Sequence, residues 1–341
     1  MRAAIRVLPG APGVYRFRDS RRRVLYIGRA SHLRRRVASY WSGHDGRPHL
    51  AAMVPQIAFV DAVECASEHE AAWLERNLLE RWLPQWNRTA GGQEVAVCIR
   101  VDASARSAGI RVLHVPVAET ERGDGRAVVR FFGPYLSAAR VRLAAAGLHR
   151  ALPLGYAADG QSGLLRELAD RRGVDSADRQ ALASELCAVL ERDEAAVAAA
   201  HSQLARLRDA AAAAEAYELA GRIQAELAAL GWITCPQRAA MLEPVEARVA
   251  SWADGVLVRF DMRGGRLVAW RVLVGRSRSQ AEPWLASTPP EWRDFADRNS
   301  ALAAQLLAAA DGASPAPQIQ NIAATGTSRT SLQGCSSWPS L

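Results

Sequence analysis

The chain has 341 residues, which is enough for roughly two domains that each bury a core. All 43 basic residues are arginine, and twelve of them lie in residues 1–50 against only two acidic residues, although the whole chain carries a net charge of only +8. Concentrated positive charge of this kind is expected of a surface that binds a polyanion such as nucleic acid.

The five cysteines are widely spaced and include no Cys-x-x-Cys pair, which argues against a zinc site and a disulfide framework. No run of about 18 apolar residues appears, and the first residues lack the apolar segment of a signal peptide. We therefore expect a soluble, cytoplasmic protein with no membrane partner.

Two short strands are predicted near the start of the chain, separated by a polar loop. In the first, Tyr15 and Phe17 share one face, and in the second Tyr26 lies opposite Leu25. Gly28 follows the second strand and allows a turn or the close approach of a ligand.

A helix is predicted from Ser31, as N-cap, to Trp41. Its apolar stripe contains an arginine, Arg36, whereas Arg34 and Arg35 point away from it and are free to face phosphate groups. The residues that form the stripe at helical spacing are Leu33, Val37, Tyr40 and Trp41.

A second helix is predicted after a strand at 57–63, and it begins at the capping-box sequence Ser67 to Glu70. Glu75 lies inside its buried stripe, where an ionised carboxylate needs a partner. Two partners satisfy that need: a divalent cation, or Arg36 in a buried ion pair. The apolar members of the stripe are Ala71, Leu74, Leu78, Leu79 and Trp82.

Five motifs in this order over about 80 residues resemble the GIY-YIG nuclease superfamily, and within it the N-terminal half of the excision-repair nuclease UvrC. The resemblance implies an α+β fold: a small α/β sandwich with a central antiparallel sheet. The motifs are Gly13-Val14-Tyr15, Tyr26-Ile27-Gly28, Leu33-Arg34-Arg35-Arg36-Val37 with Ser39-Tyr40-Trp41, the pairs Glu70-Ala71 and Leu74-Glu75, and Pro84-Gln85-Trp86-Asn87.

The resemblance also implies the roles of individual residues. Glu75 would hold one Mg²⁺ or Mn²⁺ ion, Tyr26 with Tyr15 beside it would prepare the attacking water, and Arg36 would bind the scissile phosphate. DNA binding and support of the site would fall to Arg29, Arg34, Arg35, Tyr40 and Asn87. One departure is that UvrC has lysine where this chain has Arg29, which keeps the charge but cannot lose a proton, so we expect slower or altered catalysis.

The remaining chain resembles UvrC more weakly. Residues 1–92 are predicted to be the nuclease domain and 93–160 a β-rich region containing Phe132-Gly133-Pro134-Tyr135, but without the four-cysteine cluster found in many UvrC proteins. Residues 161–235 are predicted to be helical, with a hairpin at about 198–233 that resembles the motif through which UvrC binds UvrB. We expect residues 236–310 to form a β-hairpin around Gly264-Gly265 and a helix, and 311–341 a disordered tail. The residues that this resemblance implies for docking to UvrB are Tyr217, Glu218 and Arg222.

These observations lead to one main hypothesis and two alternatives. The first is a metal-dependent DNA endonuclease, a truncated UvrC-like protein without the RNase H-like nuclease and helix-hairpin-helix repeats, which makes a single phosphodiester incision near damaged or structured DNA. The second is a non-catalytic adaptor that binds DNA and recruits UvrB. The third is a structure-specific GIY-YIG nuclease outside repair.

Overall fold

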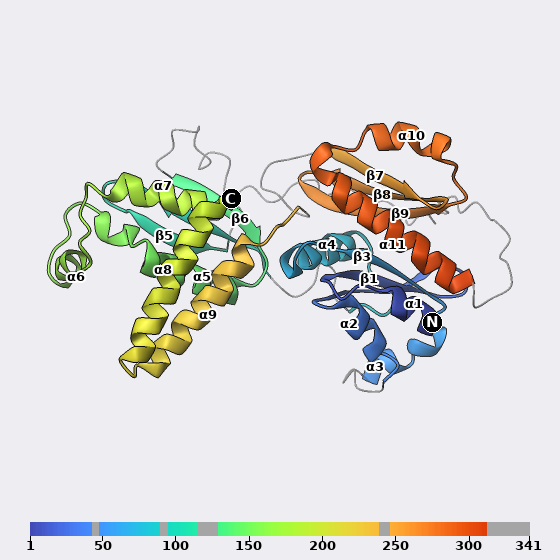
Figure 1. Cartoon of the computed structure of the whole chain (residues 1–341), viewed down its shortest axis with the longest axis horizontal. Coiled ribbons are helices and arrows are strands. Elements are labelled where there is room, and N and C mark those ends of the chain that lie inside the picture. The colour runs from blue at the N-terminus through green and yellow to red at the C-terminus, as the bar shows by residue number, and fades with distance from the viewer. Residues whose placement is uncertain (43–47, 89–94, 115–128, 239–245, 312–341) are drawn as a thin grey trace, which may run out of the picture.

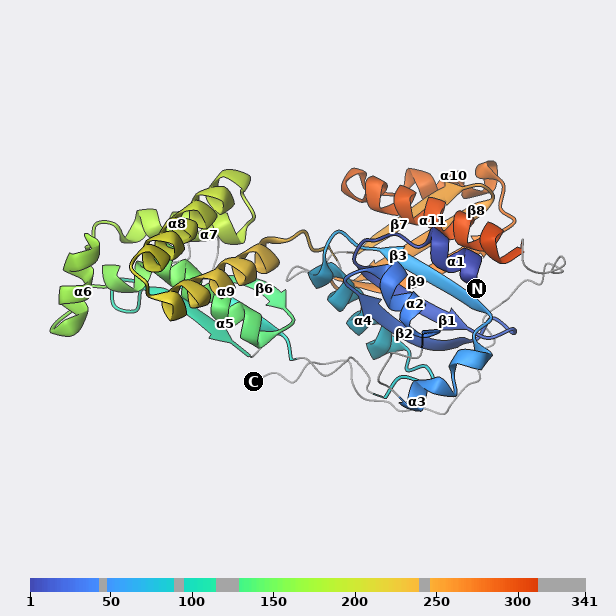
Figure 2. The same cartoon turned by 60° about the horizontal axis from the view of Figure 1, so that its bottom comes forward.

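The computed structural model describes residues 1–42, 48–88, 95–114, 129–238 and 246–311. Its elements gather in two lobes, which both views separate (Figures 1 and 2). The composite lobe combines residues 1–88 with residues 246–311, and the middle lobe contains residues 95–238. The described part of the chain contains three antiparallel sheets of three strands each with helices beside them, so the predicted α+β class is confirmed.

The first sheet of the composite lobe has the strand order β2-β1-β3 and carries Tyr15 on β1 and Tyr26 on β2. The apolar side chains of β1 are buried on both faces of the strand. Val14 belongs to one core cluster, whereas Tyr15 and Phe17 belong to another. This part of the lobe comprises α1 (Arg2–Val7), β1 (Gly13–Arg18), β2 (Val24–Ala30), α2 (Leu33–Ser39), α3 (Pro48–Ala51), the 3-10 helix η1 (Val54–Gln56), β3 (Phe59–Glu64) and α4 (Glu68–Arg81).

The second sheet of the composite lobe, in the order β7-β8-β9, contains the predicted hairpin around Gly264-Gly265, which is confirmed. Helix α11 packs against β3 of the first sheet and β7 of the second (Figure 1), and its Phe295 shares a core cluster with Val63 of β3. The elements are β7 (Ala247–Ala253), β8 (Val256–Arg263), β9 (Arg266–Val274), α10 (Arg278–Ala286), η4 (Pro290–Trp292) and α11 (Arg293–Asp311).

A buried arginine joins the two sheets of the composite lobe. Arg16 of β1 is only 3% exposed, and its Nη1 donates a hydrogen bond to the main-chain oxygen of Trp270 at 3.1 Å. Its guanidinium carbon lies 3.9 Å from the centre of the Trp270 ring, and its Nε is 2.6 Å from the Asp61 carboxylate. Residues 254 positions apart in sequence are therefore parts of one core.

The middle lobe packs a sheet of order β5-β4-β6 against helices, of which α8 and α9 form the predicted helical hairpin. The buried carboxylate of Glu226 on α9 accepts two hydrogen bonds from Arg150 on α5, at 2.7 and 2.9 Å. The elements are β4 (Val97–Asp102), β5 (Gly109–Leu113), β6 (Val129–Tyr135), α5 (Ala138–Ala151), η3 (Leu154–Ala157), α6 (Leu164–Arg172), α7 (Arg179–Leu190), α8 (Glu194–Ala213) and α9 (Tyr217–Thr234).

The two lobes meet at the beginning of α4. The fully buried ring of His69 lies 5.4 Å from that of Tyr135 and 4.6 Å from that of Trp232, both in the middle lobe. Glu70 accepts a hydrogen bond from the main-chain N–H of Arg238 at 3.2 Å. The first turn of α4, which begins the helix that carries Glu75, is therefore also the contact between the lobes.

Three details of the predicted helices were wrong. The N-cap of α2 is His32, whose ring accepts a hydrogen bond from the main-chain N–H of Arg35, rather than Ser31. Trp41 and Trp82 are 39% and 40% exposed and do not belong to the buried stripes. The reason is that α2 ends at Ser39 and α4 at Arg81, so neither tryptophan follows the helical spacing.

The tail predicted from residue 311 lies, from residue 312 onward, outside the described residues.

Candidate active site

Strands β1 and β2 bring two tyrosines together in the core. Tyr15 pairs with Gly28 across the strands and Phe17 pairs with Tyr26, which places the two tyrosine rings 6.2 Å apart. Tyr15 is 1% exposed and Tyr26 is 8% exposed. A β-carbon at position 28 would lie 2.6 Å from the hydroxyl oxygen of Tyr15, so the pair of rings requires glycine there.

Helix α2 adds a third tyrosine and an arginine to this cluster. The hydroxyl oxygen of Tyr40, just after the helix, lies 2.7 Å from that of Tyr15. Arg36 donates to the Tyr40 hydroxyl at 3.4 Å, and its guanidinium lies 5.0 Å from the centre of the Tyr40 ring. The half-buried Arg36 thus reaches the cluster from the direction that its place in the apolar stripe predicts.

Burial makes Tyr15 and Tyr40 harder to ionise than an ordinary tyrosine. It raises the pKa of Tyr15 well above its usual value, the nearby Tyr26 adds to this, and Arg36 opposes it only in part. Burial likewise raises the pKa of Tyr40, with a further contribution from Tyr15. Tyr15 and Tyr40 are therefore neutral hydroxyls at physiological pH, which suits them to hydrogen bonding rather than to taking up a proton.

Glu75 faces β2 from the middle of α4, whose start is fixed by the Ser67 side chain accepting the Glu70 N–H at 3.0 Å. One Glu75 carboxylate oxygen accepts the main-chain N–H of Arg29 at 3.1 Å, and the other lies 3.4 Å from the Nε of Arg29. The Glu75 side chain is 21% exposed, so it is open to solvent. The sequence did not indicate Arg29 as its partner, because only the packing of α4 on β2 brings the two together.

Two asparagines bind the two edge strands of the first sheet in the same way. The amide of Asn87 pairs with both the N–H and the C=O of Ile27 on β2, at 2.9 and 2.8 Å. The amide of Asn299 on α11 does the same for Glu64 on β3, at 2.7 and 3.1 Å. Asn87 thereby fixes β2 one residue before Gly28. The sequence analysis did not identify Asn299, because no local sequence pattern indicates its contact with β3.

The other predicted DNA-binding arginines lie on the surface of α2. Arg34 is exposed, but its Nε donates to the main-chain oxygen of Leu8 at 2.7 Å, so part of its side chain is used within the fold. Arg35 is exposed on the same helix. The structure thus places both arginines on the helix that carries Arg36, and their contact with DNA stays a prediction.

The partner-binding residues predicted in the helical hairpin lie in the first two turns of α9 in the middle lobe, whereas β1, β2 and α2 lie in the composite lobe (Figures 1 and 2). Tyr217 is 69% exposed, and Glu218 and Arg222 are also exposed. These side chains are available to a partner, and they take no part in the site around Glu75.

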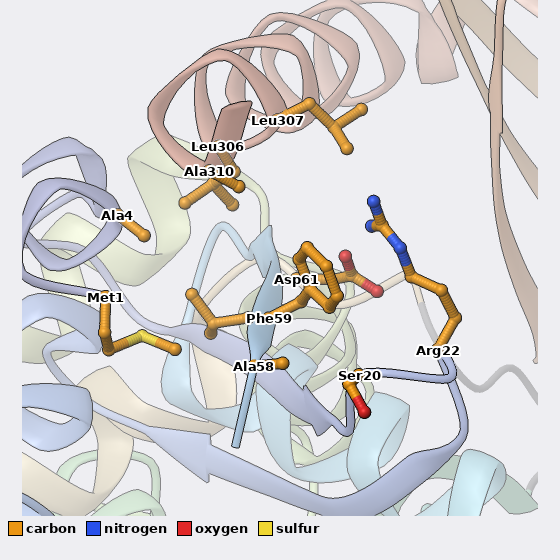
Figure 3. Close-up of a pocket in the computed structure, with 11 residues that line it drawn as sticks. Met1, Ala4, Ser20, Arg22, Ala58, Phe59, Asp61, Leu306, Leu307 and Ala310 are labelled. Carbon is orange, nitrogen blue, oxygen red and sulfur yellow. The ribbon is translucent and has the colours of Figure 1, made fainter. Parts of the chain in front are cut away.

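A hollow of about 420 Å³ lies elsewhere in the composite lobe, between α1, β3, α11 and the turn before β2 (Figure 3). The Arg22 guanidinium stacks at 3.6 Å over the ring of Phe59 at its wall. None of the predicted site residues lines this hollow, so it is not the candidate active site.

The donor atoms near Glu75 suit a hard cation. They are oxygens of one partly exposed carboxylate, and no group of three or more potential ligands from His, Cys, Asp and Glu occurs in the described ranges. Mg²⁺ often binds through a single carboxylate while it keeps several waters, so one carboxylate facing solvent fits such an ion. Binding there would compete with the Arg29 guanidinium, which contacts the same carboxylate.

Comparison with known proteins bears on the N-terminal part of the chain. Residues 11–88 match the model of the UvrC-like GIY-YIG domain. The UvrABC system protein C of Trichlorobacter lovleyi is 32% identical over 156 residues, which is 46% of this chain and 24% of that protein. The protein of the same name from Pseudomonas putida is 35% identical over 150 residues, or 44% of this chain and 23% of its own. The aligned region therefore spans about a quarter of the length of these relatives.

Among solved structures, the N-terminal GIY-YIG endonuclease domain of UvrC from Thermotoga maritima, bound to its catalytic magnesium, is 29% identical. The match covers 26% of this chain and 94% of that domain, with a TM-score of 0.24. Separately, none of the helices in the described ranges is long and apolar enough to cross a membrane.

Proposed function

We propose that this chain, whose residues 11–88 form a UvrC-like GIY-YIG domain, is a DNA endonuclease of the nucleotide excision repair type. It depends on one Mg²⁺ or Mn²⁺ ion and makes a single phosphodiester incision near damaged or structured DNA. The observation that carries this proposal is that Tyr26 on β2 and Arg36 on α2 both lie beside Tyr40, while Glu75 on α4 contacts Arg29 on the same strand β2. Such a set is suited to phosphate chemistry, because it combines a metal ligand, a phosphate-binding cation and a phenol.

Each of these residues has a defined part in the proposed reaction. Glu75 holds the metal ion, which when bound polarises the phosphate and stabilises the leaving oxyanion. Arg36 donates hydrogen bonds to the negative charge that develops on the phosphate oxygens. Tyr26 is the general base that takes a proton from the water attacking phosphorus, while the bond from phosphorus to one deoxyribose oxygen breaks.

Tyr15 and Tyr40 act differently from Tyr26 in this proposal. Because burial raises the pKa of both, they orient Tyr26 and Arg36 through packing and hydrogen bonds instead of moving a proton. Asn87 supports the site by holding β2 at Ile27. Arg29 and the exposed Arg34 and Arg35 bind backbone phosphates without regard to sequence, so DNA binding should weaken as salt increases.

The test is a nicking assay with the full chain on a duplex carrying one bulky lesion and on the same duplex undamaged. Glu75→Gln removes the carboxylate that holds the metal, and we expect nicking in Mg²⁺ or Mn²⁺ to fall about a thousand-fold. Glu80→Gln is the matched control, because Glu80 lies on the same helix but pairs with Arg76 and Arg266 at the surface. Nicking by Glu75→Gln at the parent rate would contradict the proposal.

A second candidate function, recruitment of UvrB, is favoured by one observation. Tyr217 and Leu219, which are 69% and 41% exposed, both lie in the first turn of α9, so this end of the hairpin offers apolar side chains to a partner. We expect the chain to co-purify with UvrB and Tyr217→Ala to reduce the amount recovered. Equal recovery with both forms would leave the hairpin without this role.

A further inference from the structure

The carboxylate proposed to hold the metal is already bound by a cation of the chain itself. Arg29 contacts both oxygens of Glu75, one through its main-chain N–H at 3.1 Å and the other through its Nε at 3.4 Å. The Arg29 side chain is 37% exposed. Ion pairs with this degree of exposure are weak, so the guanidinium can leave while the main-chain contact remains.

The two contacts respond differently to a divalent ion. A guanidinium next to a metal ion on the same carboxylate would place like charges side by side, which is unfavourable. The main-chain N–H carries no net charge, and β2 holds it in place because Asn87 pairs with Ile27 two residues earlier. With a metal ion bound, Glu75 would therefore lose the guanidinium but keep the main-chain N–H of Arg29, which would continue to orient the carboxylate.

We propose that Arg29 exchanges partners during the reaction cycle: it binds Glu75 when no metal is present and a DNA phosphate when the metal is bound. The proposal rests on the proposed function. Released from Glu75, the guanidinium stays beside the site and presents its planar donors to a phosphate oxygen. Metal binding and phosphate binding are then linked, so each strengthens the other.

The first test measures Mn²⁺ binding to the full chain without DNA, by electron paramagnetic resonance of the free ion. Arg29→Ala retains the main-chain N–H but removes the competing charge, and we expect Mn²⁺ to bind about five-fold more tightly at low salt. Glu75→Gln should bind Mn²⁺ far more weakly than the parent. Arg166→Ala removes one exposed arginine from α6 of the middle lobe, and it should bind Mn²⁺ as the parent does.

The outcomes of this test separate the two proposals. If Arg29→Ala binds Mn²⁺ like the parent while Glu75→Gln binds it weakly, the exchange is overturned and the proposed metal site stands. An equal gain for Arg166→Ala would also overturn the exchange, because net charge would then explain the effect. If Glu75→Gln binds Mn²⁺ as the parent does, the metal site and the exchange both fail.

The second test measures the phosphate contact with a duplex that already carries a nick, so that no cleavage occurs during the measurement. The salt dependence of its affinity is compared with and without Mn²⁺ by fluorescence anisotropy. We expect Mn²⁺ to increase the slope of log affinity against log salt by about one more in the parent than in Arg29→Ala. The same increase in both proteins would show that Arg29 gains no phosphate when the metal binds, and would overturn the exchange.

Discussion

The two lobes bury charge in different ways. In the composite lobe Asp61 is shared by Arg16 and Arg18, and Arg16 continues to the main chain and ring of Trp270. In the middle lobe the buried carboxylate of Glu226 binds Arg150 across one pair of packed helices. The first network connects segments from the two ends of the described chain, whereas the second connects neighbours in one helical bundle.

This difference shows what holds the candidate active site in shape. Strand β1 carries Tyr15 on one face, while Arg16 on the other face binds β9 of the second sheet. Asn299 of α11 binds the end of β3 in the same sheet. The sheet under the site therefore depends on residues 246–311, although those residues contribute none of the side chains proposed for catalysis.

Breaking either charge network should have the largest effect on stability. Only the change in the composite lobe should also loosen the sheet that carries the candidate active site. Asp61→Asn leaves the buried Arg16 without its anion, and we expect a loss of about 3–5 kcal/mol in the free energy of unfolding. Hydrogen exchange should become faster in both β1 and β9. Glu226→Gln should cost a similar amount but speed exchange only in the middle lobe, and faster exchange in β1 of that variant would contradict the comparison.

Local patterns predicted much of the fold and of the site. The alternation of apolar residues predicted the strands around Tyr15, Tyr26 and Gly264-Gly265, because a pleated strand turns successive side chains to opposite faces. Helical spacing placed Glu75 on the side of its helix that contacts β2, since the period of 3.6 residues defines one face, but its side chain is 21% exposed rather than buried as predicted. Helix α10 was missed, although Ser277 and Gln280 form a capping box there that is visible in the sequence.

Contacts between distant segments could not be predicted in this way. The pairing of Arg29 with Glu75 depends on the angle at which α4 crosses β2, and neither segment encodes that angle alone. The contact of Arg16 with Trp270 joins residues 254 positions apart, and the sequence pattern of either strand gives no sign of the other. A single sequence records the pattern of each element, but not which of its faces meets another element.

The contact between the lobes should be sensitive to pH, because it buries a neutral histidine. Burial lowers the pKa of His69 to about 3, with a smaller contribution from Arg192. In the unfolded chain the pKa is about 6.5, so the unfolded state binds more protons between these values and stability decreases as the pH falls from about 6.5 toward 3. We expect a loss of about 2 kcal/mol from pH 7 to pH 5, measured by urea denaturation.

His69→Gln is the control for this prediction, because it keeps a polar side chain at the position but does not titrate in that range. The nearby Glu70 also has a pKa shift, raised mainly by burial, which by itself acts in the opposite direction as the pH falls. The difference between the parent and His69→Gln therefore isolates the histidine. An identical pH dependence in both proteins would show that His69 does not control the contact.

Two glycine substitutions should have opposite effects in the two lobes. Gly28→Ala in the composite lobe would place a β-carbon 2.6 Å from the Tyr15 hydroxyl oxygen, and we expect a cost of about 1–3 kcal/mol together with reduced nicking. Gly221 in α9 has no atom within 4 Å of the corresponding position, so Gly221→Ala should stabilise the helix by about 0.5–1 kcal/mol. Thermal unfolding of both variants measures this, and tolerance of alanine at position 28 would mean that the tyrosine pair is loosely packed.

The smallest effects on stability should come from removing single hydroxyl groups. Tyr15→Phe loses one hydrogen bond to Tyr40 between two neutral, buried groups, which costs about 1 kcal/mol, whereas Tyr217→Phe at the exposed end of α9 should change stability by less than about 0.5 kcal/mol. If Tyr26 rather than Tyr15 accepts the proton, Tyr15→Phe should keep the shape of the pH profile of nicking, while Tyr26→Phe should lower the rate at every pH by at least about a hundred-fold. Equal losses in the two variants would show that the buried hydroxyl of Tyr15 takes part in proton transfer despite its raised pKa.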